Sequence, residues 1–178
     1  PVWPPSGIAF AALLLLGPRN WPAIVAGAFA ANLATFHANG VPLNGGVALA
    51  SCAIAAGNAL EALAGAWLLR RYADPTQPLG QLQNVYKFAL IAMVMCLVSS
   101  GIGATTLVLC GLAPPAAYST VMLTWWVGDT AGVLLVTPAI LVWMIGPLPA
   151  WRWRAALEAA LSLAALLALI ALIFFRAY

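Results

Sequence analysis

The chain has 178 residues, of which 65% are hydrophobic and only 6% are charged, against about 45–50% and about 25% in soluble domains. A soluble domain with so few charged residues would expose large apolar patches and aggregate, so the composition excludes a soluble globular protein. The net charge is +3, but Arg and Lys occur singly or in pairs at segment ends, and no basic stripe that would indicate a nucleic-acid partner is present.

Long apolar stretches lie between the charged residues. About 20 helical residues cross the ~30 Å hydrocarbon core of a bilayer, and continuous apolar runs without period-two alternation indicate helices rather than a barrel. In chain order we expect six segments, at about 6–16, 21–36, 46–69, 85–112, 118–145 and 155–175. The first is too short to cross the bilayer unaided. The predicted fold is all-α, a polytopic transmembrane bundle of about six helices that forms a single integral membrane domain over residues 1–178.

Six of the seven basic residues lie in or beside every second loop. They are Arg19, Arg70, Arg71, Lys87, Arg152 and Arg154, and the seventh, Arg176, follows the last segment. The loops at about 37–45 and 113–117 carry neither Lys nor Arg. Positive loops face the cytoplasm, so both ends of the chain are expected on the outer side. A domain that controls a cytoplasmic process then needs one more helix before the first residue and one after the last, which gives about eight.

Two acidic residues lie deep inside the predicted helices. Glu61 is about 22 Å of helix from the outer end of its segment, and Asp129 is about 16 Å from the outer end of the fifth segment. Asn32 and Ser99 reach a similar depth from the cytoplasmic side. A strongly polar side chain at this depth costs several kcal/mol unless it faces the bundle interior and finds a partner. We therefore expect these four side chains to converge near the middle of the membrane.

Small and polar residues surround both acids. Asn58 precedes Glu61 by three residues and shares its helix face, and glycines four residues before and after this acid permit close helix approach. Trp125 and Trp126 precede the second acid and either stack on a ligand or pack against neighbouring helices. The small, polar run at 99–106 is expected to break the fourth helix and line a cavity.

Neither acid has a cationic partner in the membrane, because no Lys or Arg lies at this depth. Each acid is then either protonated or available to a cationic ligand or ion. A second interpretation is that both acids only bond Asn, Trp or backbone groups and fix the helix packing. The residues alone leave a ligand or proton response and a purely structural role open.

No metal site, cofactor or catalytic group of residues is expected. The three cysteines have no paired spacing, and the single histidine, His37, cannot supply two axial haem ligands. No serine has a histidine partner at a matching depth, and no lysine lies at mid-helix to form a retinal Schiff base. The chain is therefore not expected to be an enzyme by itself.

Three motifs occur in order along the chain: Trp3-Pro4-Pro5-Ser6-Gly7-Ile8-Ala9, Gly57-Asn58-Ala59-Leu60-Glu61-Ala62, and Trp125-Trp126-Val127-Gly128-Asp129-Thr130-Ala131-Gly132-Val133-Leu134-Leu135-Val136-Thr137-Pro138. Together they resemble MASE1, the bacterial membrane-associated sensor domain found at the N-terminus of histidine kinases and diguanylate cyclases. The resemblance covers nearly the whole chain. It implies an input module of about eight helices in the bacterial cytoplasmic (inner) membrane, and Glu61, Asp129 and Asn58 match its motif positions.

The leading hypothesis is a sensory input domain that detects a small-molecule, ionic or lipid stimulus near the bilayer midplane. Its expected partners are the lipid bilayer, an unknown small ligand and a fused cytoplasmic signalling domain, a histidine kinase or diguanylate cyclase, and a homodimer is expected. Two alternatives stay open. One is a transport or solute-binding component, because polar midplane residues beside broken helices also mark substrate sites. The other is a passive anchor that only localises and dimerises an output domain.

Overall fold

The computed structural model describes residues 2–73, 81–145, 157 and 161. The chain divides into two compact units, Pro1–Met144 and Ile145–Tyr178, and nearly all of the described residues belong to the first. The elements, in order, are α1 (Pro4–Leu16), η1 (Pro18–Asn20), α2 (Trp21–Ala38), α3 (Gly45–Tyr72), α4 (Leu82–Leu109), η2 (Pro115–Ala117) and α5 (Tyr118–Ile145).

The predicted all-α class is confirmed, and the fifth helix begins and ends where the sequence predicts. Two helices, α3 and α4, and the stretch Pro115–Met144 that contains most of α5 are long and apolar enough to cross a membrane, while α1 is a shorter apolar helix. The sixth predicted segment, 155–175, lies almost entirely outside the described residues, so the count of about six is not confirmed.

Local signals set several helix ends. Prolines occupy the first positions of α1, where the missing N–H groups cost no helical hydrogen bond. The helix stops at Gly17, whose φ of 90° favours glycine. Asn44 caps α3 by accepting a hydrogen bond from the backbone N–H of Val47 at 2.9 Å. Gly111, at φ 69°, follows the end of α4, which comes three residues earlier than the sequence predicts.

The expected break in the fourth helix is wrong, because α4 continues through the run at 99–106. Two of its hydroxyl groups bond to carbonyl groups one turn earlier. Ser100 Oγ donates to the Cys96 carbonyl at 2.8 Å, and Thr106 Oγ1 donates to the Ile102 carbonyl at 2.7 Å. These side chains satisfy their own polar groups within the helix, which lets a polar run remain helical in an apolar environment.

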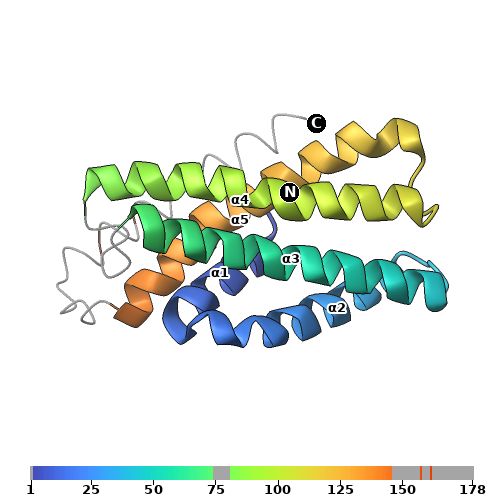
Figure 1. Cartoon of the computed structure of the whole chain (residues 1–178), viewed down its shortest axis with the longest axis horizontal. Coiled ribbons are helices and arrows are strands. Elements are labelled where there is room, and N and C mark those ends of the chain that lie inside the picture. The colour runs from blue at the N-terminus through green and yellow to red at the C-terminus, as the bar shows by residue number, and fades with distance from the viewer. Residues whose placement is uncertain (1, 74–80, 146–156, 158–160, 162–178) are drawn as a thin grey trace. The chain divides into compact units, whose positions relative to one another are not determined.

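The long helices alternate in direction, so that η1, the end of α3 and the start of α4 lie at one end of the bundle (Figure 1). Arg19 is in η1, and Arg70 and Arg71 are in the last turn of α3. At this end Arg70 Nη2 donates at 3.0 Å to the carbonyl of Leu13 in the last turn of α1, and the same carbonyl also accepts the Gly17 backbone N–H at 3.1 Å. The basic residues of these two loops therefore share one end, as the loop pattern requires; its cytoplasmic orientation stays a prediction.

The first helix begins level with the interior of α5. The backbone N–H of Trp3 donates to the Gly128 carbonyl at 2.9 Å, and Thr137 Oγ1 donates to the Gly7 carbonyl at 2.9 Å. A Cβ atom on Gly132 would collide with the backbone carbonyl of Trp3. Gly7 and Gly132 thus allow the backbones of α1 and α5 to touch. Inside a membrane, where the hydrophobic effect does not drive helices together, such close packing stabilises the pair.

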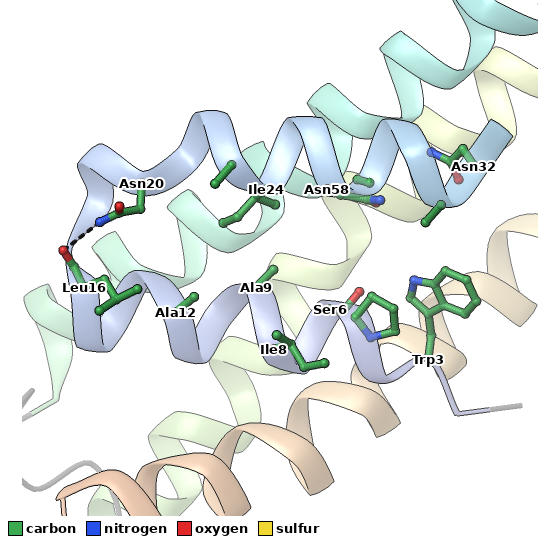
Figure 2. Close-up of a pocket in the computed structure, with 15 residues that line it drawn as sticks. Trp3, Ser6, Ile8, Ala9, Ala12, Leu16, Asn20, Ile24, Asn32 and Asn58 are labelled. Carbon is green, nitrogen blue, oxygen red and sulfur yellow. Dashed lines mark hydrogen bonds between the residues drawn. The ribbon is translucent and has the colours of Figure 1, made fainter. Parts of the chain in front are cut away.

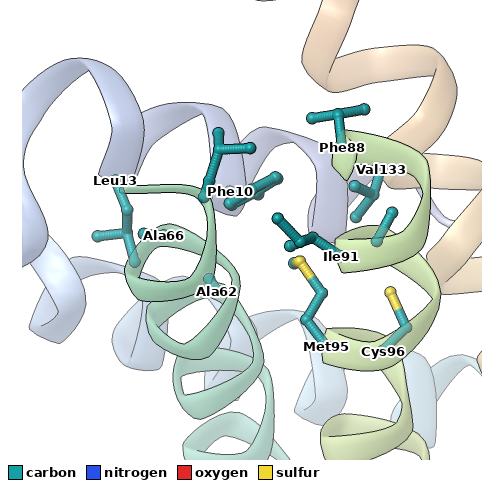
Figure 3. Packing of buried hydrophobic residues seen from close by; sticks show 11 residues of the cluster. Phe10, Leu13, Ala62, Ala66, Phe88, Ile91, Met95, Cys96 and Val133 are labelled. Carbon is teal, nitrogen blue, oxygen red and sulfur yellow. The ribbon is translucent and has the colours of Figure 1, made fainter. Parts of the chain in front are cut away.

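Buried hydrophobic side chains of α1, α3, α4 and α5 form the apolar core (Figure 3). The rings of Phe10 and Phe88 stack with their centroids 5.9 Å apart. Gly65 faces the thioether of Met95, as the predicted small-residue spacing around Glu61 requires. By contrast, α2 contains no buried residue, so it lies at the periphery of the described bundle, where it packs along α3.

We predict that Gly132→Ala destabilises the bundle, because its new methyl group meets the Trp3 backbone, which cannot yield as a flexible side chain does. Overpacking of this kind costs about 1–3 kcal/mol. The measurement is a thermal unfolding curve in detergent. Gly101→Ala is the control, since a Cβ there meets no atom within 4 Å; equal melting temperatures for the two variants would contradict the backbone contact.

Candidate functional site

The carboxyl group of Asp129 is held between two other helices. Ser6 Oγ of α1 donates to Asp129 Oδ1 at 2.9 Å, and Ser99 Oγ of α4 donates to Asp129 Oδ2 at 2.9 Å. All three residues are buried, and Asp129 is only 6% exposed. Because these two donors come from α1 and α4, Asp129 ties α1, α4 and α5 together.

Glu61 is more deeply buried and less well satisfied. It is 1% exposed. Cys96 Sγ of α4 donates to Glu61 Oε1 at 3.6 Å, whereas Glu61 Oε2 has no hydrogen-bond partner among the described residues. The two carboxyl groups contact the same turn of α4, because Cys96 and Ser99 are three residues apart. We define the polar cluster as Ser6, Glu61, Cys96, Ser99 and Asp129; it joins four helices.

The two acids of the polar cluster have no basic partner among the described residues. Within residues 2–73 and 81–145, no basic side chain is bonded to Glu61 or Asp129. Two neighbouring carboxylates in a low-dielectric interior repel each other, and a lone intramembrane charge is costly. The arrangement therefore favours a proton or a cation held at the cluster.

Two cavities lie beside the cluster. The first, which we call the α2–α5 cavity, has a volume of about 310 Å³, and its walls include Asn32, Asn58, Trp125 and Asp129. The second, the α1–α2 cavity, has a volume of about 340 Å³ and runs between α1 and α2 (Figure 2). Both volumes fall at the lower end of the range of small-molecule sites, about 300–1,000 Å³.

The structure brings six of the seven predicted site residues together. Four of them line the α2–α5 cavity: Asn32, Asn58, Trp125 and Asp129. Ser99 bonds to Asp129, and Glu61 accepts from Cys96, which lies on the same helix as Ser99. Their role in binding a ligand stays a prediction.

Trp126 lies apart from the other six. Its Nε1 donates to the Met93 carbonyl of α4 at 2.7 Å, and it lines neither cavity. Trp126 therefore fixes α5 against α4.

Three residues of the site are not predicted from the sequence: Ser6, Cys96 and Trp3. Ser6 and Trp3 both belong to the first motif, which could have marked them as functional. Because the helix that follows Trp3 is short, the sequence does not indicate how deep in the membrane these two residues lie. His37 is exposed near the end of α2, and no group of three metal-binding side chains occurs among the described residues.

We predict that Ser99→Ala lowers the stability of the bundle by about 1–3 kcal/mol, because it leaves Asp129 Oδ2 buried without its donor. Ser51→Ala is a matched control, since Ser51 is equally buried and its hydroxyl has no partner among the described residues. Unfolding in detergent, followed by circular dichroism, measures both. If Ser51→Ala costs as much as Ser99→Ala, the Asp129 hydrogen bond is not the stabilising contact.

Comparison with known proteins identifies one family. The family model of MASE1 matches residues 1–177, nearly the whole chain, and so includes the three motifs that meet at the site. No curated protein and no solved structure matches the chain. MASE1 is a membrane-associated sensory domain family. The chain therefore belongs to the MASE1 family.

Proposed function

We propose that this domain is a sensory input module of the bacterial cytoplasmic membrane, which detects a small-molecule, ionic or lipid stimulus near the bilayer midplane. We further propose that it regulates a fused cytoplasmic histidine kinase or diguanylate cyclase, acting as a homodimer. The observation that supports this proposal is the polar cluster, which links four helices through two acids that lack a basic partner among the described residues.

The cluster supplies the physical basis for a response. A ligand shifts a conformational equilibrium only if it binds two packings with different affinity. The Asp129 carboxyl contacts α1 and α4 at once, so a proton, cation or ligand at this carboxyl changes the contacts of both helices with α5. Such a change in helix packing can travel along the helices to the cytoplasmic end and alter the output domain.

The test uses Glu61→Gln and Asp129→Asn in the full-length protein in native membranes. Both keep the side-chain volume and replace an acid by an amide, which introduces an N–H donor and removes the charge. We expect each to change kinase or cyclase output by about 5-fold or more, the lower range of allosteric coupling. Phosphate incorporation or cyclic dinucleotide production is the measurement.

Gln81→Glu is the control for this test, because it makes the converse exchange at an exposed residue before α4. Its output is expected to match that of the unaltered protein. Normal amounts of both acid variants in the membrane, with unchanged output, would contradict a sensory role for the cluster and favour a passive anchor.

One observation favours transport as a second candidate. The first helix begins level with Gly128 in the interior of α5, beside the polar cluster. Short helices that end near the membrane middle are common at substrate sites of transporters. If the domain transports a cation, purified protein in vesicles takes up Na⁺ down a gradient, and Asp129→Asn abolishes the uptake. Absence of uptake, together with altered output in the acid variants, would exclude this candidate.

A further inference from the structure

The two cavities are neighbours that share part of their walls. Trp3, Asn32 and Asn58 line both of them, where α1 begins and the second half of α2 passes α3. Figure 2 shows these three residues at one end of the α1–α2 cavity, with Leu16 and Asn20 at the other. One ligand can therefore occupy both spaces, with one part in each cavity.

The walls of the α2–α5 cavity are mostly apolar, so its few polar groups define what it accepts. The amide Nδ2 of Asn32 is buried and has no hydrogen-bond partner among the described residues, so this donor needs an acceptor. Asp129 lies in the same wall, and none of the described residues that line the cavity is basic, so an anionic head group is repelled. The rings of Trp3 and Trp125 add flat apolar surface on which a planar group stacks.

A cationic head would balance the charge of the polar cluster but not satisfy the Asn32 amide, whereas a neutral acceptor satisfies that amide. Each carboxyl oxygen of Asp129 already accepts one serine hydroxyl. An ammonium group has donors but no acceptor, so it would leave Asn32 Nδ2 unsatisfied. A carbonyl oxygen provides the missing acceptor and brings no charge into the membrane interior.

The α1–α2 cavity is mostly apolar and elongated. It extends from Asn32 of α2 to Asn20, which precedes the first residue of that helix, a length of about 18 Å at 1.5 Å per residue. Its walls include Ile8 and Leu16, which are 52% and 69% exposed, so within the described part of the chain it opens on the outer surface of the bundle. The cavity is open at Gly27, because a Cβ atom built there would meet no atom within 4 Å.

We propose that these two cavities bind one neutral, lipid-soluble molecule with a flat, carbonyl-bearing ring and an apolar chain, the chemistry of a membrane quinone. The ring occupies the α2–α5 cavity, with a carbonyl oxygen accepting from Asn32 Nδ2. The chain lies in the α1–α2 cavity and enters from the lipid. As a statement about the stimulus, this inference rests on the proposed sensory function.

The test measures binding of decyl-benzoquinone to the full-length protein in lipid nanodiscs, by saturable quenching of tryptophan fluorescence. Gly27→Phe fills the chain cavity and is expected to weaken binding at least tenfold. Asn32→Leu removes the donor at similar volume and is expected to weaken binding about tenfold. Gly101→Phe, at another glycine whose Cβ meets nothing but which lines neither cavity, is expected to bind as the unaltered protein does.

Two chain-matched probes test the head group. Decanoate, an anion, and decylamine, a cation, are expected not to displace the quinone. Displacement by decylamine would overturn the neutral-head assignment in favour of a cation at Asp129, and equal binding to Gly27→Phe and Gly101→Phe would overturn the site.

Output activity measured on the same nanodiscs separates the two proposals. Site-specific quinone binding without any change in kinase or cyclase output would leave the ligand class standing and contradict the sensory role. Absent binding, together with altered output in Glu61→Gln, would overturn the ligand class alone.

Discussion

The structure depends on the need to satisfy one carboxyl group away from water. Asp129 can be buried only because Ser6 and Ser99 each donate to one of its oxygens, and these donors come from two other helices. That requirement fixes where α1 starts, since Ser6 stands in its first turn. The Trp3 to Gly128 hydrogen bond and the close approach at Gly132 hold it there. The polar contact and the backbone contact therefore define the same position and support each other.

The two faces of α1 meet different surroundings, and this difference gives the site its character. Phe10 and Leu13 point into the close-packed core with α3 and α4. Ile8 and Leu16 line the cavity on the side of α2, a helix with no buried residue. A ligand on the α2 side therefore meets cavity walls and not the close-packed core. Buried polar groups also await a partner, because among the described residues neither Glu61 Oε2 nor the amide of Asn32 has a hydrogen-bond partner.

The sequence predicts this membrane bundle well where a single helix carries the information. The ends of α5 follow from its long apolar segment, although Asp129 lies within it, and counting residues from the loops is enough to bring Asp129 and Ser99 to one depth. Prediction fails where the contact partner decides. The run at 99–106 contains residues that break helices elsewhere, but the hydroxyls of Ser100 and Thr106 bond to carbonyl groups of α4 itself. Ser6 escapes prediction because a short helix near the start of the chain suggests an incomplete span, and only the contact with α5 reveals its depth.

The half-length first helix also constrains how the protein is made. At 13 residues α1 is about 20 Å long, too short to insert into the bilayer as an independent span. The Leu13 carbonyl in its last turn accepts from Arg70 of α3, and Trp3 at its start donates to Gly128 of α5. Both partners are synthesised later than α1, so this segment leaves the ribosome before its contact residues exist. Its docking is therefore a late, post-insertional step of biogenesis, which is completed only after α5 has been made.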